Sequence, residues 1–260
     1  MIFTLYGDFV HAHGDELALA SLIKLMARCG VSEPAVRQAT SRLSHQGWLR
    51  ARKAGTRSFY ALTARGVRRI QKIAPRIYEA SGEWDGHWRL LTYTVAEGLR
   101  EARDRLRKDL AVLGFAPLSA STWLSPREAL EAAREAARAH GLETCIDLFE
   151  GDHRGPMSDR ELLRKCWDVD AIADAYAEFI DAYRPKLQSE RRRPLLSDTQ
   201  AFVERVWLVQ GFRRFAYIDP GIPSTLLPPH WPGTVAGAMF RAYYAIISQR
   251  ATRFFEATVG

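Results

Sequence analysis

The chain of 260 residues is 47% hydrophobic and 26% charged, with 37 Lys and Arg against 30 Asp and Glu, a composition typical of a globular protein with two or three domains. Its three cysteines are odd in number and widely spaced, which excludes a disulfide scaffold and predicts buried, reduced thiols. No stretch approaches the ~20 consecutive apolar residues of a membrane span, so we expect a cytoplasmic protein, and one without a bound metal.

The net charge of +7 is concentrated in the first 75 residues. This segment holds twelve Lys and Arg against four Asp and Glu, a formal charge of +8, whereas the other 185 residues carry 25 against 26, or −1. Such asymmetry favours binding to a polyanion, and nucleic acid is the commonest one. A solvated basic face would have the same composition, so the pattern within the segment must distinguish the two.

A helix-turn-helix is predicted inside this basic segment. An apolar stripe indicates a first helix that starts near Ser21, and Gly30 suits the left-handed position just after its end. Ser32 is a suitable N-cap for a second helix that runs to about Gln46 and stops at Gly47.

The polar side of the second helix has the residue types that read DNA. At 100° per residue, apolar and polar residues fall on opposite sides of this helix. Arginine, glutamine and serine pair with base edges in the major groove, which is ~12 Å wide and admits a helix. No acidic residue occurs between Glu33 and Glu79, which favours an approach to phosphates. The predicted base-reading residues are Arg37, Gln38, Ser41, Arg42 and His45.

Two strands over residues 48–53 and 57–62, joined by a turn at 54–56, follow and complete a winged helix. Polar and basic residues at the tip of this hairpin are placed to contact phosphate or the minor groove. They are Arg52, Lys53, Thr56 and Arg57. The hairpin aromatics are expected to pack against the helices, and they are Trp48, Phe59 and Tyr60. The next helix, capped by Thr63, is expected to end before Pro75.

Residues 84–152 are predicted to form a ferredoxin-like domain, because strands and helices alternate in the order βαββαβ. The predicted elements are a strand at 88–95, a helix at 99–113, two strand pieces within 114–124, an Ala-rich helix from Ser125 to His140 and a strand at 144–149.

From Ser158 onward the pattern is helical, with long helices predicted at 168–184, 198–217 and 234–257. A Pro-rich stretch at 219–233 must cross a surface or line a crevice. Arginine pairs suit phosphates and tryptophan suits an aromatic ring, so this stretch is a candidate ligand site. Its candidate residues, each of which also has a structural interpretation, are Arg213, Arg214, His230 and Trp231.

Five strings span the chain: Leu5-Tyr6-Gly7-Asp8, Val36-Arg37-Gln38-Ala39 through Arg42-Leu43 to Gly47-Trp48-Leu49, Arg57-Ser58-Phe59-Tyr60, Trp84-Asp85-Gly86-His87-Trp88, and Leu226-Leu227-Pro228-Pro229-His230-Trp231-Pro232-Gly233. Together they resemble the PaaX family of bacterial transcriptional repressors. The resemblance implies a homodimeric repressor of phenylacetic acid catabolism genes that phenylacetyl-CoA releases from double-stranded operator DNA. It also implies three parts: a winged helix, a middle domain similar to Cas2, and a helical C-terminal domain.

The expected fold is therefore α+β, with an N-terminal winged helix-turn-helix at 1–78, a ferredoxin-like, Cas2-like domain at 84–152 and an all-helical domain at 157–260. A hinge at 80–85 is expected to transmit the effect of an acyl-CoA effector to the DNA-binding part. No catalytic residue and no cofactor are expected. The first strand of the middle domain ends at Tyr93 to Ala96 without the aspartate that a Cas2-like nuclease would place there.

Two other functions remain open. An acyl-CoA enzyme with a DNA-binding head would need a nucleophile or paired carboxylates beside a histidine, and neither His153 nor His230 has a Ser or Cys at motif spacing. Release of free thiol from phenylacetyl-CoA would identify such an enzyme. An architectural DNA-binding protein without an effector would remain bound to DNA when acyl-CoAs are added.

Overall fold

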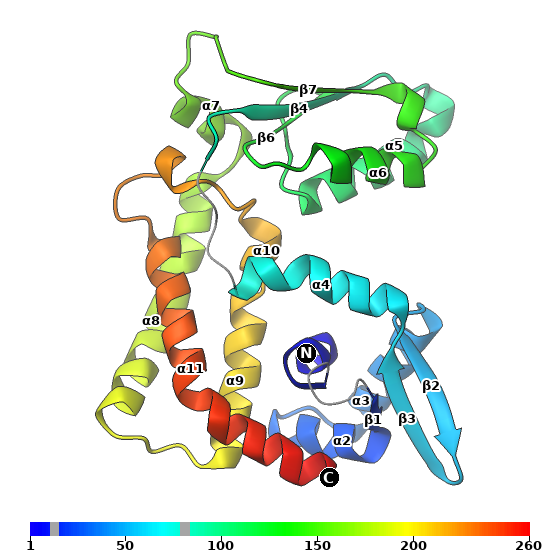
Figure 1. Ribbon diagram of the computed structural model, residues 1–260, viewed down its shortest axis with the longest axis vertical. Helices are drawn as coiled ribbons and strands as arrows, with labels where there is room; N and C mark the ends of the chain where they lie inside the picture. Colours follow the sequence, from blue (N-terminus) through cyan, green and yellow to red (C-terminus); the bar gives the residue numbers. More distant parts are fainter. Residues whose placement is uncertain (11–15, 79–83) are drawn as a thin grey trace. The chain divides into compact units, whose positions relative to one another are not determined.

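The computed structural model describes residues 1–10, 16–78 and 84–260 (Figure 1). The chain forms two compact units, which are described separately. The first contains Met1–Glu79, Glu178–Arg214 and Ala236–Gly260, and the second contains Ala80–Ala177 and Phe215–Val235. Residues 80–83 of the predicted hinge lie outside the described ranges. In the parts of the chain that are described, no helix is both long and apolar enough to cross a membrane.

The basic segment has the element order expected of a winged helix. Its strands form an antiparallel sheet in the order β1-β3-β2. Its elements are α1 Ile2–Leu5, which continues as a π-helical turn at Tyr6–Val10, then β1 Glu16–Ala18, α2 Leu19–Arg28, α3 Glu33–His45, β2 Leu49–Ala54, β3 Arg57–Leu62 and α4 Ala64–Tyr78. We call residues 1–78 the head.

The turn between α2 and α3 forms as the sequence predicts. Gly30 has φ of +80°, a left-handed conformation that glycine adopts without steric cost. Helix α2 begins at Leu19, two residues before the predicted start near Ser21. Ser32 occupies the N-cap position of α3, but its side chain makes no capping hydrogen bond, contrary to the prediction.

Three long helices complete the first unit: the part of α8 (Val169–Arg192) after Ala177, α9 (Asp198–Phe212), and the part of α11 (Pro232–Val259) after Val235. Aromatic rings join α9 and α11 to the head. The Phe9 ring centroid lies 5.2 Å from those of Phe202 and Phe255, and the Tyr78 centroid lies 5.9 Å from that of Phe240. The first and last helices of the head therefore share one hydrophobic core with α9 and α11.

Two helices continue past prolines at which the sequence predicts an end. Helix α4 runs on to Tyr78 beyond Pro75, and α8 runs through Pro185 to Arg192. A proline inside a helix removes one backbone hydrogen bond, but residues beyond each proline are held by tertiary contacts. Ile77 and Leu187 are buried, and this burial outweighs the local preference to stop. The helix predicted at 198–217 is instead interrupted after Phe212, and α10 follows at Phe215–Ile218.

The second unit contains the predicted ferredoxin-like fold. Its antiparallel sheet has the order β5-β6-β4-β7, and helices α5 and α6 lie side by side on one face (Figure 1). The core between helices and sheet includes Leu91, Leu106, Leu110 and Trp123. The elements are β4 Trp88–Tyr93, α5 Arg100–Val112, β5 Ala116–Pro117, β6 Thr122–Ser125, α6 Leu130–Ala139, β7 Ile146–Gly151 and α7 Asp159–Cys166. The predicted βαββαβ order is confirmed.

Helix α6 begins at Leu130 and not at Ser125, because Ser125 pairs with Arg89 as the last residue of strand β6. The thiols also differ in part from the prediction. All three cysteines are free thiols, but only Cys29 is buried, whereas Cys145 and Cys166 are half-buried.

Candidate nucleic-acid interface

Helix α3 presents a continuous exposed face. Val36 and Thr40 are buried, and the Thr40 hydroxyl donates a 2.9 Å hydrogen bond to the Val36 carbonyl, which keeps this polar group satisfied inside. The opposite side of the helix is open to solvent. The exposed residues there are the five predicted for base reading, Arg37, Gln38, Ser41, Arg42 and His45.

The cations of this face are held only weakly by the protein. Arg37 donates from Nε to Glu33 at 2.8 Å, one turn earlier on the same helix, and more than half of each side chain is exposed. Such a surface pair contributes only ~0.3–0.5 kcal/mol, so Arg37 can exchange it for another anion. Arg42 has no carboxylate partner within the described parts of the chain. Both guanidinium groups are therefore available to a ligand.

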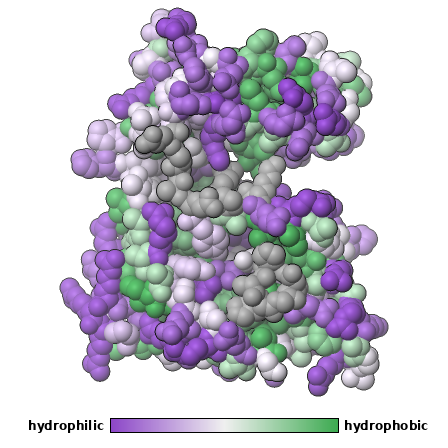
Figure 2. Space-filling view, in the orientation of Figure 1, coloured by the Kyte–Doolittle hydropathy of each residue, from purple (hydrophilic) through white to green (hydrophobic). Residues whose placement is uncertain are grey.

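The hairpin of β2 and β3 extends from the head, and hydrophilic residues predominate in this region of the visible surface (Figures 1 and 2). Arg52, Lys53, Thr56 and Arg57 are all exposed, and Gly55 has φ of +58° in the turn. Lys53 and Arg57 have no carboxylate partner among the described residues. The hairpin tip thus presents two uncompensated cations.

Arg52 differs from the other hairpin cations, because Glu16 of β1 binds it. Arg52 donates to the two carboxylate oxygens at 3.1 and 2.5 Å. This hydrogen bonding lowers the pKa of Glu16 and raises that of Arg52. The Arg52 guanidinium also lies over the Phe59 ring, 4.7 Å from its centroid. No local sequence pattern indicates this pair, which partly neutralises Arg52.

Trp48 anchors the hairpin to the helices, as expected. Its ring meets Phe3 edge to face at 5.9 Å, and the Arg65 guanidinium lies 3.9 Å from its centroid. Tyr60 accepts a 2.8 Å hydrogen bond at its carbonyl oxygen from the buried Tyr6 hydroxyl. Phe59 instead lies under Arg52 of the hairpin itself. These contacts fix the hairpin relative to α1 and α4.

The four candidate ligand residues of the Pro-rich stretch are divided between the two units. Arg213 donates a 3.0 Å hydrogen bond to the Thr4 hydroxyl of the head, and Arg214 pairs with Glu178 at 3.4 Å. Trp231 is buried and meets the Tyr176 ring edge to face. His230 is exposed, with φ of +59°. Three of the four therefore have identified structural contacts.

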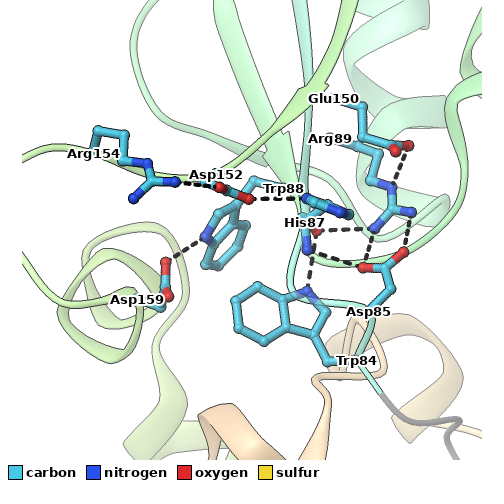
Figure 3. A network of polar contacts seen from close by, with 9 residues as sticks. All are labelled: Trp84, Asp85, His87, Trp88, Arg89, Glu150, Asp152, Arg154 and Asp159. Carbon is cyan, nitrogen blue, oxygen red and sulfur yellow. Dashed lines mark hydrogen bonds and ion pairs between the residues drawn. The ribbon is translucent and has the colours of Figure 1, made fainter.

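A polar network surrounds Arg89 in the second unit (Figure 3). The Arg89 side chain is only 2% exposed and contacts three carboxylates. It donates from both terminal nitrogens to Asp85, and from Nη2 to Glu128 at 2.6 Å, while its Nε lies 3.2 Å from Glu150. These acids come from before β4, after β6 and from β7, so one guanidinium ties three segments together.

The other residues of the Trp84 to Trp88 string extend this network. His87 Nδ1 lies 3.0 Å from Asp152, which also binds Arg154 (Figure 3). Trp88 donates from Nε1 to Asp159 at 2.7 Å, at the start of α7. The string therefore connects β4 to the segment that follows β7, and its role in the structure is positional.

Acid is expected to destabilise the second unit through Asp85. The hydrogen bonds from Arg89 and from the His87 backbone lower the pKa of Asp85, so its stabilising effect is complete above the unfolded pKa of ~3.9 and is lost as pH falls below that value. Asp85→Asn should lower the melting temperature at pH 7. We expect a decrease of only a few degrees, because solvent screens the half-exposed carboxylate. The difference between wild type and variant should shrink below pH 4; a constant difference in melting scans would contradict this.

Among the described residues, no group of three or more His, Cys, Asp or Glu side chains is arranged to hold a metal ion. The chemical capacity of the head lies in its exposed cations and amides. A helix of this kind, with a cationic hairpin beside it, can bind phosphates and present hydrogen-bonding groups to base edges.

Three family models match successive parts of the chain. Residues 1–66 match the family model of a PaaX-like protein, residues 81–163 that of the PaaX protein central Cas2-like domain, and residues 167–257 that of the PaaX-like protein C-terminal domain.

Two known proteins are similar over nearly the whole chain. The transcriptional repressor PaaX of Escherichia coli (strain K12) is 31% identical over 270 residues, which include all of this chain and 84% of the relative. The solved structure of the uncharacterized protein Rv0674 from Mycobacterium tuberculosis has a TM-score of 0.60 at 21% identity, covering 99% of this chain and 96% of that one. The second similarity shows the fold, whereas the first, together with the three family models, shows that the chain belongs to the PaaX family.

Proposed function

We propose that this protein is a transcriptional repressor that binds operator DNA through its head. The proposal rests on two observations that agree. The chain belongs to the family whose Escherichia coli member is named a transcriptional repressor, and its helix α3 presents an exposed, cationic face. The residues proposed to read bases are Arg37, Gln38, Ser41, Arg42 and His45, and those proposed to contact the backbone are Arg52, Lys53, Thr56 and Arg57. No catalytic step is part of this function.

The finer proposal concerns the genes and the signal. The resemblance to the family favours a homodimer that represses phenylacetic acid catabolism genes and is released by an acyl-CoA, with phenylacetyl-CoA as the first candidate. Two heads related by a two-fold axis would read an inverted repeat whose half-sites lie about one or two helical turns apart. A tenfold preference of the effector for the DNA-incompetent state corresponds to only ~1.4 kcal/mol per site.

The test is a gel-shift titration with the DNA upstream of the protein's own gene, repeated at several salt concentrations. If about four to six cations per head neutralise phosphates, log K should fall against log salt with a slope of about −7 to −11 for the dimer. A slope near −2 would show that the head is not the DNA surface. Phenylacetyl-CoA should abolish the gel shift and raise the melting temperature of the protein. If the gel shift is unchanged by phenylacetyl-CoA, the proposed effector is refuted, whereas the proposal of a DNA-binding repressor stands.

Glu16→Gln is expected to strengthen DNA binding. The Glu16 carboxylate occupies Arg52 and would repel a phosphate, so its removal releases one cation per head. We expect the affinity to rise about two- to tenfold at low salt and the salt slope to become steeper by about one per head. Fluorescence anisotropy with labelled operator measures both quantities.

Glu143→Gln is the matched control, because Glu143 forms a similar forked pair with Arg138 at 3.0 and 2.7 Å in the second unit. It removes the same charge and releases the same kind of cation. An equal gain in both variants would mean that net charge, and not Arg52, sets the affinity.

A further inference from the structure

Helix α9 contacts the first helix of the head along two turns. The Thr4 hydroxyl donates to Gln210 at 2.6 Å and accepts from Arg213 at 3.0 Å. One turn later along the head, Asp8 accepts from Arg205 Nε at 2.8 Å. Thr4 and Asp8 therefore both bind side chains of a single C-terminal helix, across more than 190 residues of sequence.

The pair of Asp8 and Arg205 is buried and fully hydrogen-bonded. The two side chains are 2% and 7% exposed. Asp8 also accepts from the hydroxyls of Tyr78 at 3.0 Å and Tyr244 at 2.7 Å. Arg205 also donates from Nη2 to Asp8 at 3.1 Å and from Nη1 to the Thr252 hydroxyl at 3.2 Å. One ion pair thus joins the first helix of the head, the last residue of α4, and helices α9 and α11.

Aromatic packing also restrains the position of the Arg205 side chain. The Arg205 guanidinium lies between two rings, 4.2 Å from the Phe9 centroid and 4.5 Å from the Tyr244 centroid. Burial and the nearby Asp8 carboxylate raise the pKa values of Tyr78 and Tyr244, so both hydroxyls stay protonated and act as donors. A buried pair of this kind adds little net stability but is sensitive to geometry, which suits it to fixing an orientation.

We propose that Asp8 and Arg205, supported by Thr4 and Arg213, are positioning residues that fix the orientation of the head on the C-terminal helices. The recognition helix α3 then occupies a defined position relative to α9, and a change in the C-terminal helices is transmitted to the DNA-binding face through these contacts. This inference rests on the proposed function for its effect on DNA, but the orientation itself is measurable without DNA.

The orientation can be measured as a distance between spin labels on α2 and α11. Ala27 and Ala245 are both exposed, and each is replaced by cysteine and labelled in a background with Cys29, Cys145 and Cys166 changed to alanine. Pulsed electron paramagnetic resonance is recorded with excess unlabelled chain, so that only the coupling between the two labels of one chain is measured. The wild-type contacts predict one narrow distance distribution, and Asp8→Asn or Thr4→Val should broaden it about twofold or more.

Glu190→Gln is the matched control. Glu190 is also a buried carboxylate paired with an arginine, Arg250, at 2.6 Å, but both residues belong to the C-terminal helices. It should lower the melting temperature as Asp8→Asn does, yet leave the distance distribution narrow. If Asp8→Asn does not fold, two milder variants replace it. Arg205→Lys keeps the charge but loses the forked hydrogen bonding, and Thr4→Val replaces a hydroxyl with a methyl group.

Operator affinity completes the test, measured well below the melting temperature of every variant. Asp8→Asn should weaken binding about tenfold and Glu190→Gln by less than about twofold. A broad distribution in the wild type, equal broadening in Glu190→Gln, no broadening in any head variant, or broadening without weaker binding would each overturn the inference. A wild-type protein that binds no operator would refute the proposed function instead, while the distances would still decide whether the head is held.

Discussion

Replacing Arg37 and Arg42 together with alanine is expected to abolish operator binding. Both side chains are exposed on the outer face of α3, five residues apart, where a guanidinium can bridge O6 and N7 of guanine. Each such contact is worth about 1–3 kcal/mol, so the double variant should lose at least about thirtyfold in affinity. A gel-shift titration measures the loss, and circular dichroism should show an unchanged fold, since neither residue contributes to the core.

Arg191→Ala with Arg192→Ala removes the same charge from the exposed last turn of α8 and serves as the control. Loss of binding in both double variants would mean that total charge alone governs the affinity. Binding that survives in Arg37→Ala with Arg42→Ala would show that α3 is not the recognition helix. The proposed effector, phenylacetyl-CoA, should shift the melting temperature of all these variants equally.

The face of α3 could be predicted because its cause is local. Helical periodicity alone separates the buried Val36 and Thr40 from the exposed Arg37 and Arg42. The βαββαβ order of the second unit was likewise predictable, because each strand and helix carries its own hydrophobic pattern. Glycine at position 30 marked the turn, because few other residues adopt a positive φ without strain.

Helix ends at prolines were predicted wrongly, because tertiary burial decides them. Ile77 and Leu187 are buried beyond Pro75 and Pro185, so the helices continue despite the lost backbone hydrogen bond. The start of α6 was misplaced for a similar reason: Ser125 pairs with Arg89 in the sheet, a contact that local propensity does not contain.

The long-range ion pairs had no local signal. Glu16 binds Arg52 from 36 positions away, and Asp8 binds Arg205 from 197 positions away. Nothing in the spacing of these residues indicates their partners. Two family strings nevertheless contain members of the networks, since Asp8 ends the first string and Asp85 lies within the fourth. A resemblance can therefore mark a residue whose partner only the fold reveals.

The other large effect is expected from Arg89→Met, which should destabilise the second unit severely. The guanidinium is almost completely buried and contacts Asp85, Glu128 and Glu150. Its removal leaves three carboxylates close together without a cation, and breaking a buried pair by removing one partner costs about 3–5 kcal/mol. Because the carboxylates are 44–70% exposed, solvent reduces this cost, and we expect a loss of about 2–4 kcal/mol in unfolding free energy.

Two comparisons separate this electrostatic cause from the loss of packing. Arg138→Met removes an exposed arginine paired with Glu143 in the same unit and should cost far less stability than Arg89→Met in urea denaturation, because solvent screens this pair. Arg89 lowers the pKa of Asp85, so the stabilisation from this pair is lost as pH falls below about 4, and the difference between wild type and Arg89→Met should shrink. A difference that stays constant from pH 7 to pH 3 would mean that Arg89 acts through its buried hydrocarbon chain and not through its pair with Asp85.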